Sequence, residues 1–167
     1  MSDCVYPCPC GYFQDAQKPC TCAPAVVTKY QKRISGPMLD RIDIHIEVPR
    51  VDYEKLSGDR LGETSESIRK RVQAARDIQL HRFTNSQSTD IICNADMRVG
   101  EIRQFCRLQD EGQSLMRAAM SQMNLSARAY HRILKLARTI ADLAESEEIQ
   151  SVHLAEALQY RPKLMLG

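Results

Sequence analysis

Apolar and polar positions follow two different patterns along this chain. Residues 42–48 (IDIHIEV) carry an apolar side chain at every second position, a period that predicts a half-buried strand stopped by Pro49. From residue 64 onward, apolar positions recur every three or four residues, which is the period of an amphipathic helix. The pattern therefore predicts one strand in the front third and a helical back two-thirds.

Helix start and stop signals divide the back two-thirds into about five helices. Thr64 or Ser65 suits the cap of the first helix, which should end near Phe83. Ser126 suits the cap of the most periodic helix, and Ser151 suits the cap of the last one. Two more helices are expected between them, over residues 96–107 and 110–123.

The helical periodicity also predicts which positions are buried. The most periodic helix should bury a stripe that consists of Tyr130, Ile133, Leu134, Ala137, Ile140, Ala141 and Ala144. The first helix should bury a shorter stripe of Ile68, Val72, Ala75 and Ile78. These two stripes would supply much of the core of a helical bundle.

Composition places turns in the front third and gives no sign of a membrane segment. Ten of the 14 glycines and prolines lie within the first 62 residues, so loops are expected there, with one short helix over 26–35. No apolar run approaches the roughly 20 residues that span a bilayer, and no signal-peptide pattern occurs, so we expect a cytoplasmic protein without membrane contact. The net charge of +2 does not by itself indicate a nucleic-acid partner.

Five of the seven cysteines lie in the first 22 residues, and four of them form two C-x-C pairs. Cys8 and Cys10 make one pair, Cys20 and Cys22 the other, and a short turn-rich loop joins them. Four thiolates so spaced can surround one Zn²⁺, in a structural role because no coordination position stays open. Disulfides and simply buried thiols are the alternatives; a reducing cytosol argues against the first, and the turn-rich setting against the second.

Two arginines occupy positions from which a guanidinium can reach an anionic ligand. Arg41 stands directly before the predicted strand; a surface ion pair with Asp40 is the alternative. Arg128 lies in the first turn of the most periodic helix, where its charge opposes the helix dipole; a solvated face shared with Arg132 and Lys135 is the alternative. A third basic group, on the first long helix, either follows a nucleic-acid backbone or is merely solvated: Arg69, Lys70, Arg71, Arg76 and Arg82.

Four stretches carry a family resemblance that covers nearly the whole chain. They are PCPCGYF…CTC over 7–22, KYQKRISGPMLDRIDIHIEVPRV over 29–51, LSARAYHRILKLARTIADL over 125–143 and HLAEALQYR over 153–161. These stretches resemble the magnesium-chelatase-like AAA+ ATPases of the YifB/ComM family. The family is bacterial and cytoplasmic, and it includes a hexameric DNA helicase that promotes branch migration during natural transformation. The resemblance implies ATP with Mg²⁺, DNA and a homo-hexamer for the full-length protein.

The resemblance also implies roles for single residues. Arg41, in GPMLDRIDI, matches the arginine finger, which contacts the γ-phosphate of ATP bound to a neighbouring subunit. Arg128, in LSARAYHR, matches sensor 2, which touches the phosphates from the lid of its own subunit. The four paired cysteines match the cysteine motif of the family. Tyr6 stands where the family has its sensor 1 asparagine, so that role does not carry over.

The expected fold is mainly α: a cysteine-rich and strand remnant of an AAA+ α/β core, followed by a helical-bundle lid. Residues 1–50 would form the end of the core, 51–63 a linker and 64–167 the lid. No G-x-x-x-x-G-K-[ST] phosphate loop occurs, so the chain is expected to be part of an ATPase and inactive alone. Two other functions remain open, a zinc-stabilised adaptor for protein or nucleic acid and a regulatory ATPase subunit of a metal chelatase.

Overall fold

The computed structural model describes residues 6–15, 17–33, 35–39, 41–48, 51, 62–84 and 90–161. Within these ranges the regular secondary structure is helical and no β-strand forms, which confirms the mainly α class. The chain divides into two compact units, Met1–Ile42 with Glu47–Ser57 and Asp43–Ile46 with Gly58–Gly167. No helix in the described ranges has the length and apolarity needed to cross a bilayer.

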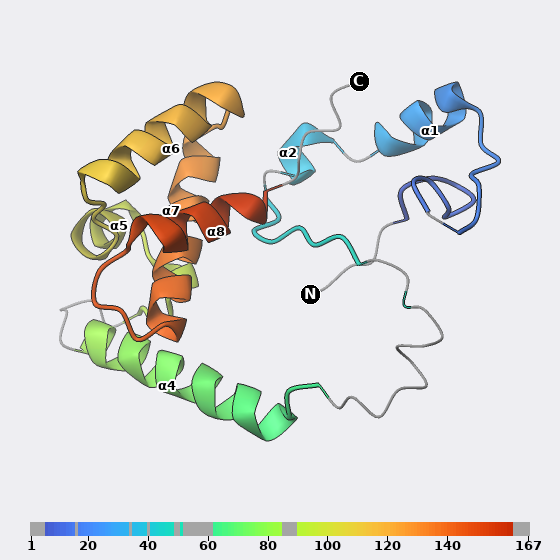
Figure 1. The fold of residues 1–167 in the computed structure, drawn as a ribbon. Helices are drawn as coiled ribbons and strands as arrows, with labels where there is room; N and C mark the ends of the chain where they lie inside the picture. Colours follow the sequence, from blue (N-terminus) through green and yellow to red (C-terminus); the bar gives the residue numbers. More distant parts are fainter. Residues whose placement is uncertain are drawn as a thin grey trace. The chain divides into compact units, whose positions relative to one another are not determined.

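The first unit contains the cysteine loop and two short helices, α1 (Pro24–Gln31) and α2 (Gly36–Leu39) (Figure 1). α1 begins with Pro24, whose missing N–H is not needed at a helix start. The predicted helix over 26–35 is therefore shifted toward the N-terminus, and the separate turn of α2 follows it. The side chain of Gln31 donates to the carbonyl oxygen of Pro7 at 3.1 Å, which ties the end of α1 to the start of the cysteine loop.

Residues 42–48 do not form the predicted strand. A strand needs a neighbour that accepts its N–H groups and donates to its carbonyls, and the described part of the chain places none beside this segment. Among the described residues, the N–H of His45 donates to the carbonyl oxygen of Tyr160 at 2.8 Å, and the N–H of Ile42 donates to the carbonyl oxygen of Leu39 at 3.1 Å. The alternating apolar side chains of the segment are exposed instead of half-buried: Ile42, Ile44, Ile46 and Val48.

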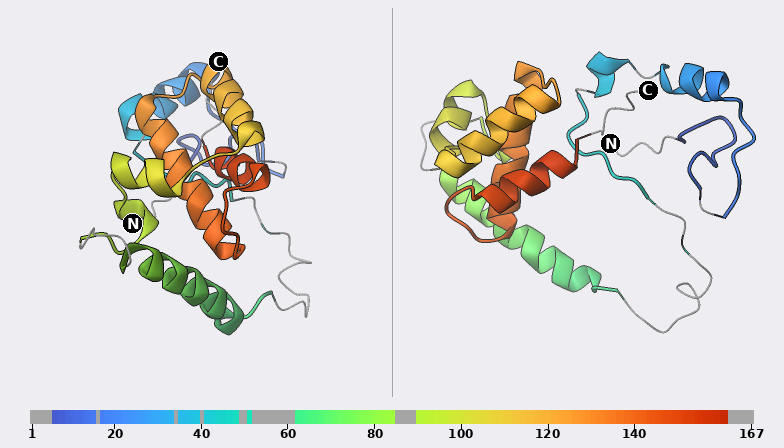
Figure 2. Two further views of the ribbon diagram at one scale, coloured as in Figure 1. Left: turned by 90° about the vertical axis from the view of Figure 1, so that its left-hand side faces the viewer. Right: turned by 45° about the horizontal axis from the view of Figure 1, so that its top comes forward.

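The second unit is a bundle of five α-helices and one 3₁₀ turn in the residues that the structure describes, as the periodicity predicts. These elements are α4 (Ser65–Thr84), η1 (Asn94–Asp96), α5 (Val99–Phe105), α6 (Asp110–Gln122), α7 (Ala127–Leu143) and α8 (Ser151–Gln159). α7 is the central helix and contacts α4, η1, α5 and α8, while α6 packs on α8 (Figures 1 and 2). The core of this unit is built around α7.

α7 begins and packs as its sequence predicts. The Ser126 side chain accepts the N–H of Ala129 at 3.1 Å, which is the expected N-cap. Tyr130 is half-buried, and Ala144 is exposed because the helix ends at Leu143. The other predicted stripe positions are all buried: Ile133, Leu134, Ala137, Ile140 and Ala141.

α4 is capped as predicted but packs over only half of its length. The Thr64 hydroxyl oxygen accepts the N–H of Ser67 at 3.3 Å. Ile68 and Val72, expected in the buried stripe, are each 41% exposed because residues 65–73 lie on the surface. The buried side chains all belong to the second half: Ala75, Gln79 and Phe83.

Two other helix starts differ from the prediction by a few residues. α5 begins at Val99 and not at residue 96, because the turn η1 and an extended Arg98 precede it. α8 has Gln150 as its N-cap, and Ser151 is its first residue. The Ser151 hydroxyl donates to Glu111 at 3.1 Å, so it links α8 to α6 and does not cap its own helix.

A buried ionic cluster joins α4, η1 and α7. The Asp142 carboxylate accepts from Arg82 Nη1 at 2.9 Å, from Arg138 Nε at 3.0 Å and from Asn94 Nδ2 at 2.7 Å. Arg82 was predicted to lie on a basic surface face, but it turns inward and its side chain is only 14% exposed. This correction removes Arg82 from any surface that a nucleic acid could follow.

The remaining donors of the cluster are also used. Arg138 donates through its two terminal nitrogens to the carbonyl oxygens of Ser146 and Glu147, and its burial lowers the pKa of its guanidinium. Arg82 donates in addition to Asn94 Oδ1 at 3.0 Å. Each guanidinium is thus hydrogen-bonded inside the protein, as buried charges must be.

Replacing Asp142 with alanine is expected to lower the free energy of unfolding of the second unit by about 3–5 kcal/mol, because two buried guanidiniums would lose their counter-charge. Urea denaturation followed by circular dichroism measures this loss. The matched control is Glu66→Ala, which removes an exposed pair with Lys70 (2.9 Å) and should cost less than about 0.5 kcal/mol. Equal losses from the two variants would contradict the role of the cluster.

Candidate functional site

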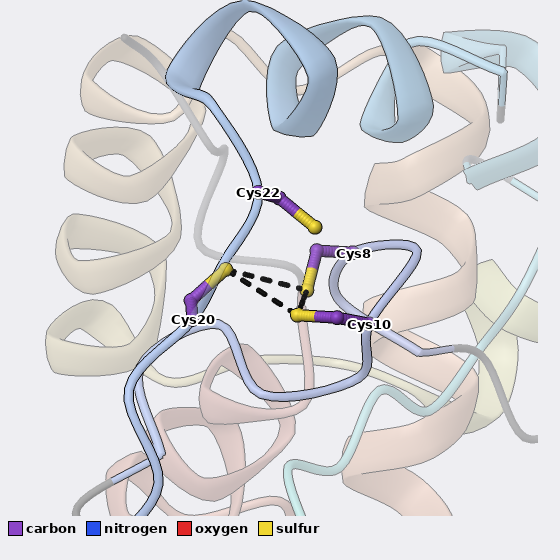
Figure 3. A group of neighbouring side chains, drawn as sticks. All are labelled: Cys8, Cys10, Cys20 and Cys22. Carbon is purple, nitrogen blue, oxygen red and sulfur yellow. Dashed lines mark hydrogen bonds between the residues drawn. The ribbon is translucent and has the colours of Figure 1, made fainter.

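Four cysteine side chains converge in the first unit. Figure 3 shows Cys8, Cys10, Cys20 and Cys22 pointing toward one another, and their Sγ atoms all lie within 4.8 Å of one another. The separations are 3.3 Å for Cys8–Cys10, 3.5 Å for Cys10–Cys20 and 3.8 Å for Cys8–Cys20. A tetrahedral site with metal–sulfur bonds of about 2.3 Å has sulfur–sulfur edges of about 3.8 Å. The four thiols are therefore placed to hold one metal ion.

A glycine turn brings the first cysteine pair together. Gly11 has φ +81°, a conformation that residues with a Cβ rarely adopt, and its N–H donates to the carbonyl oxygen of Cys8 at 3.0 Å. A Cβ at this position would also lie 3.3 Å from the ring of Tyr6. The turn therefore requires glycine, and it reverses the chain directly after Cys10 so that the loop can return with the second pair.

The surroundings separate the pKa values of the thiols. Backbone hydrogen bonds from Tyr12 and Thr21 hold the pKa of Cys10 at about 5. The backbone of Cys22 favours the Cys20 thiolate, but burial and hydrogen bonds to neighbouring cysteines outweigh it and raise the pKa of Cys20 to about 12. Cys10 is thus a thiolate at neutral pH, whereas Cys20 gives up its proton there only in exchange for a bound cation.

Arg41 lies in the turn that follows α2, and it is exposed. Its backbone N–H donates to the carbonyl oxygen of Met38 at 3.0 Å, which fixes the chain direction at this point. The alternative partner Asp40 lies outside the described residues. The expected strand after Arg41 is absent, so the turn of α2, and not a sheet, positions this arginine.

Arg128 lies in the first turn of α7 and differs from the two cations that follow it on the same helix. Arg132 Nη1 bonds Asp43 at 2.7 Å, and Lys135 Nζ donates to the carbonyl oxygen of Ala95 at 2.7 Å. The Arg128 side chain is exposed and makes no hydrogen bond or ion pair with the part of the chain that the structure describes. The three cations therefore do not form one solvated face of α7, because two of them are bonded to other parts of the protein.

The Asp43–Arg132 pair predicts a measurable restraint on residues 42–48. Asp43→Asn should speed hydrogen exchange at the His45 amide a few-fold, because an ion pair of this exposure contributes about 0.2–1 kcal/mol. Hydrogen–deuterium exchange read by mass spectrometry measures the change. Glu47→Gln is the control, since it removes a charge from the same segment without breaking the pair. Unchanged exchange in Asp43→Asn would show that the pair restrains nothing.

Sequence reasoning did not predict a crevice of about 310 Å³ in the second unit. Arg82, Arg107 and Arg138 line it together with Glu147 and Glu148. Two of these arginines already donate to Asp142, so the crevice covers a structural cluster and is no anion site. The signal in the sequence was the spacing of Arg138 and Asp142, four residues apart beside the apolar stripe of α7.

Two protein families match this chain, one over the part with the cysteine cluster and the other over the helical bundle. The family described as Magnesium chelatase, subunit ChlI matches residues 3–56, and the one described as Magnesium chelatase, subunit ChlI C-terminal matches residues 62–161. Competence protein ComM of Haemophilus influenzae is 40% identical over 162 residues, which are 96% of this chain and 30% of ComM. YifB of Escherichia coli is 39% identical over 156 residues, 93% of this chain and 29% of YifB.

The similarity extends over both units, but the chain spans only about 30% of the length of the curated relatives that it matches. The C-terminal family match covers the helical bundle with Arg128, and the other match covers the cysteine cluster with Arg41. The chain therefore belongs to the magnesium chelatase ChlI family, among the relatives of ComM and YifB.

Proposed function

We propose that this chain supplies the arginine finger, sensor 2 and helical lid of an ATP-driven motor that acts on DNA. The observation that carries the proposal is the state of Arg128: it is exposed in the first turn of α7, while Arg132 and Lys135 on the same helix are engaged with other parts of the protein. A cation at a helix N-terminus is unfavourable unless an anion lies nearby. A nucleotide phosphate is an anion that would remove this cost.

Arg41 would act on the ATP of a neighbouring subunit, as the family resemblance implies. Its exposure at the end of a turn fits a residue that reaches out of its own subunit. This role requires an oligomer, a homo-hexamer by the same resemblance, with ATP and Mg²⁺ bound by parts of the full-length protein outside this chain. In this proposal residues 1–50 end the ATPase core, 51–63 link the two parts and 64–167 form the lid of a cytoplasmic enzyme.

Zinc is the metal that best suits the four cysteines. Four thiolate ligands, near-tetrahedral spacing and the absence of an open position are typical of structural zinc. Cys8, Cys10, Cys20 and Cys22 would hold the ion, which would fix the loop that leads into α1. The ion would stabilise the fold and take no part in ATP hydrolysis.

A second function is favoured by the separate cysteine unit. A zinc-stabilised unit distinct from the helical bundle would suit an adaptor for protein or nucleic acid without any ATPase role. A regulatory ATPase subunit of a metal chelatase is the third reading, in line with the description of the family. The adaptor reading predicts that the two arginines are irrelevant to nucleotide turnover, which separates it from the motor.

The test is a chimera of ComM from Haemophilus influenzae in which this chain replaces the matching segment. Under the proposal the chimera assembles and hydrolyses ATP within about tenfold of ComM, whereas the isolated chain hydrolyses none. Light scattering reports the assembly, and phosphate release reports turnover. A chimera that assembles without hydrolysing ATP, or ATP hydrolysis by the isolated chain, would overturn the proposal.

A further inference from the structure

Aromatic side chains gather around the cysteine cluster. Four of the nine aromatic residues of the chain lie between residues 6 and 30, although the composition is poor in aromatics. Tyr6 is 64% exposed, and Tyr12, Phe13 and Tyr30 are half-buried. The main hydrophobic core lies in the other unit, so none of these four rings contributes to it.

Two of these rings belong to segments that a hydrogen bond joins. The ring of Tyr6 lies close to Gly11, since a Cβ there would be 3.3 Å from Tyr6 Cδ1. The 3.1 Å hydrogen bond from Gln31 to Pro7 joins the residues that directly follow Tyr30 and Tyr6. Tyr6 and Tyr30, 24 positions apart in the sequence, are thereby brought to the same end of the unit.

Cationic groups lie over the rings of Tyr12 and Tyr30. Lys18 Nζ is 4.1 Å from the ring centroid of Tyr12, and Arg33 Cζ is 5.6 Å from that of Tyr30. Both distances are within the range of cation–π contacts. Each pair sets a positive charge beside an aromatic plane.

The charge of this part of the chain is one-sided. Between residues 6 and 33 the sequence has four basic residues, Lys18, Lys29, Lys32 and Arg33, all of them exposed. The single acidic residue is Asp15, and its carboxylate accepts the N–H groups of Gln17 and Lys18 at 2.8 and 3.0 Å. The exposed charged side chains of this segment are therefore mainly basic, and they belong to the same unit as the aromatic rings.

We propose that this tyrosine–lysine surface, formed by Tyr6, Tyr12, Tyr30, Lys18, Lys29, Lys32 and Arg33, binds single-stranded nucleic acid. Unpaired bases stack on aromatic rings, and cations beside the rings neutralise the adjacent phosphates. Paired bases in a duplex do not offer their faces in this way, so a single strand is the partner that fits. The inference rests on the proposed function only in taking DNA as the nucleic acid.

The basic face of α4 fits a nucleic acid less well. Lys70 and Arg71 on this helix pair with Glu66 and Glu63 at 2.9 and 3.1 Å. Phe83, the aromatic residue of α4, is buried. The helix therefore offers fewer uncompensated charges and no stacking surface.

The test is fluorescence anisotropy of a labelled 20-nucleotide oligo(dT) titrated with the full chain. Binding should weaken with salt, with a log–log slope of about −3 if four phosphates are neutralised. Tyr6→Ala and Tyr30→Ala should each weaken binding about 5- to 100-fold, whereas Tyr6→Phe should bind like the parent because it keeps the ring. Zinc content and circular dichroism verify that each variant keeps its fold.

Three results would overturn the inference. They are the absence of binding at low salt, equal binding by Tyr6→Ala and its parent, and equal competition by poly-glutamate, which has charge but no bases. Arg69→Ala with Arg76→Ala is the matched control on α4. Loss of binding in that control alone would move the DNA contact to α4 and leave the motor proposal standing, since ATP turnover by the ComM chimera tests the motor separately.

Discussion

If the four cysteines hold zinc as proposed, removing the ion is expected to unfold the cysteine unit and leave the helical bundle folded. The first unit has little apolar core of its own: only Cys8 and Val27 are buried among its described hydrophobic residues. A structural zinc site contributes on the order of 10–16 kcal/mol at neutral pH, which is more than so small a unit can lose. A chelator titration, followed by amide exchange in residues 6–33 and 90–161, measures the two units separately.

Substituting one of the four cysteines should also show that the site depends on all of its thiol ligands. Cys20→Ser is expected to lower zinc affinity several hundredfold, since one of four ligands carries about a quarter of the binding free energy. Cys93→Ser is the matched control, because Cys93 lies in the helical unit and its thiol bonds Asp96 at 3.2 Å. Metal analysis of protein purified without added zinc should give about one ion per chain. Metal-free protein with protected amides in residues 6–33 would contradict the zinc site.

The sign of the pH dependence follows from the thiols. The pKa of Cys20 is raised to about 12 and that of Cys22 is also raised, so both are protonated at neutral pH before zinc binds. Binding therefore releases these protons, and affinity rises with pH by about tenfold per unit for each proton released. Lowering the pH from 7.5 to 6.5 should weaken zinc binding about 100-fold. A pH-independent affinity in this window would show that the thiols are already ionised.

Periodicity and capping residues predicted most of the helical unit. The predictions that failed depend on contacts between residues far apart in the sequence. The stripe and Ser126 cap of α7 depend on residues within a few turns, so periodicity located them. The strand over 42–48 fails because alternation is necessary for a strand but a neighbouring strand is also required. The position of Arg82 was wrong for a similar reason: its partner Asp142 is 60 residues away, and no local pattern joins them.

The candidate site also contains features that local sequence predicted and features that it did not. The cysteine cluster was predicted from spacing alone, since C-x-C pairs and Gly11 fix its geometry within one loop. Arg41 and Arg128 gained their roles from the family resemblance, and these roles remain predictions. The tyrosine–lysine surface was missed because Tyr6 and Tyr30 are far apart in the sequence, and the bond between Gln31 and Pro7 that joins their neighbouring residues has no local sequence signal.

Arg41→Ala in the ComM chimera is expected to reduce ATP turnover by about 10³- to 10⁵-fold while leaving ATP binding unchanged. An arginine finger stabilises charge that develops on the transferred phosphoryl group, and its loss therefore acts on kcat and not on the ground state. Arg128→Ala should instead weaken ATP binding as well, because sensor 2 would touch the bound nucleotide of its own subunit. Phosphate release and nucleotide titration measure the two effects. Arg117→Ala, on the exposed side of α6, is the control and should change neither.

Mixed assemblies of the ComM chimera, which is proposed above to form a hexamer, separate a finger that acts across the subunit interface from a residue that merely supports its own subunit. Arg41→Ala subunits retain an intact ATP site, and subunits with an inactivated ATP site retain Arg41. When the two are mixed, intact sites and intact arginines meet at some interfaces, so turnover should reappear although each pure hexamer is inactive. A finger acting within its own subunit could never be restored in this way. Mixtures as inactive as the pure variants would therefore remove Arg41 from the role of arginine finger, whatever the effect of the single substitution.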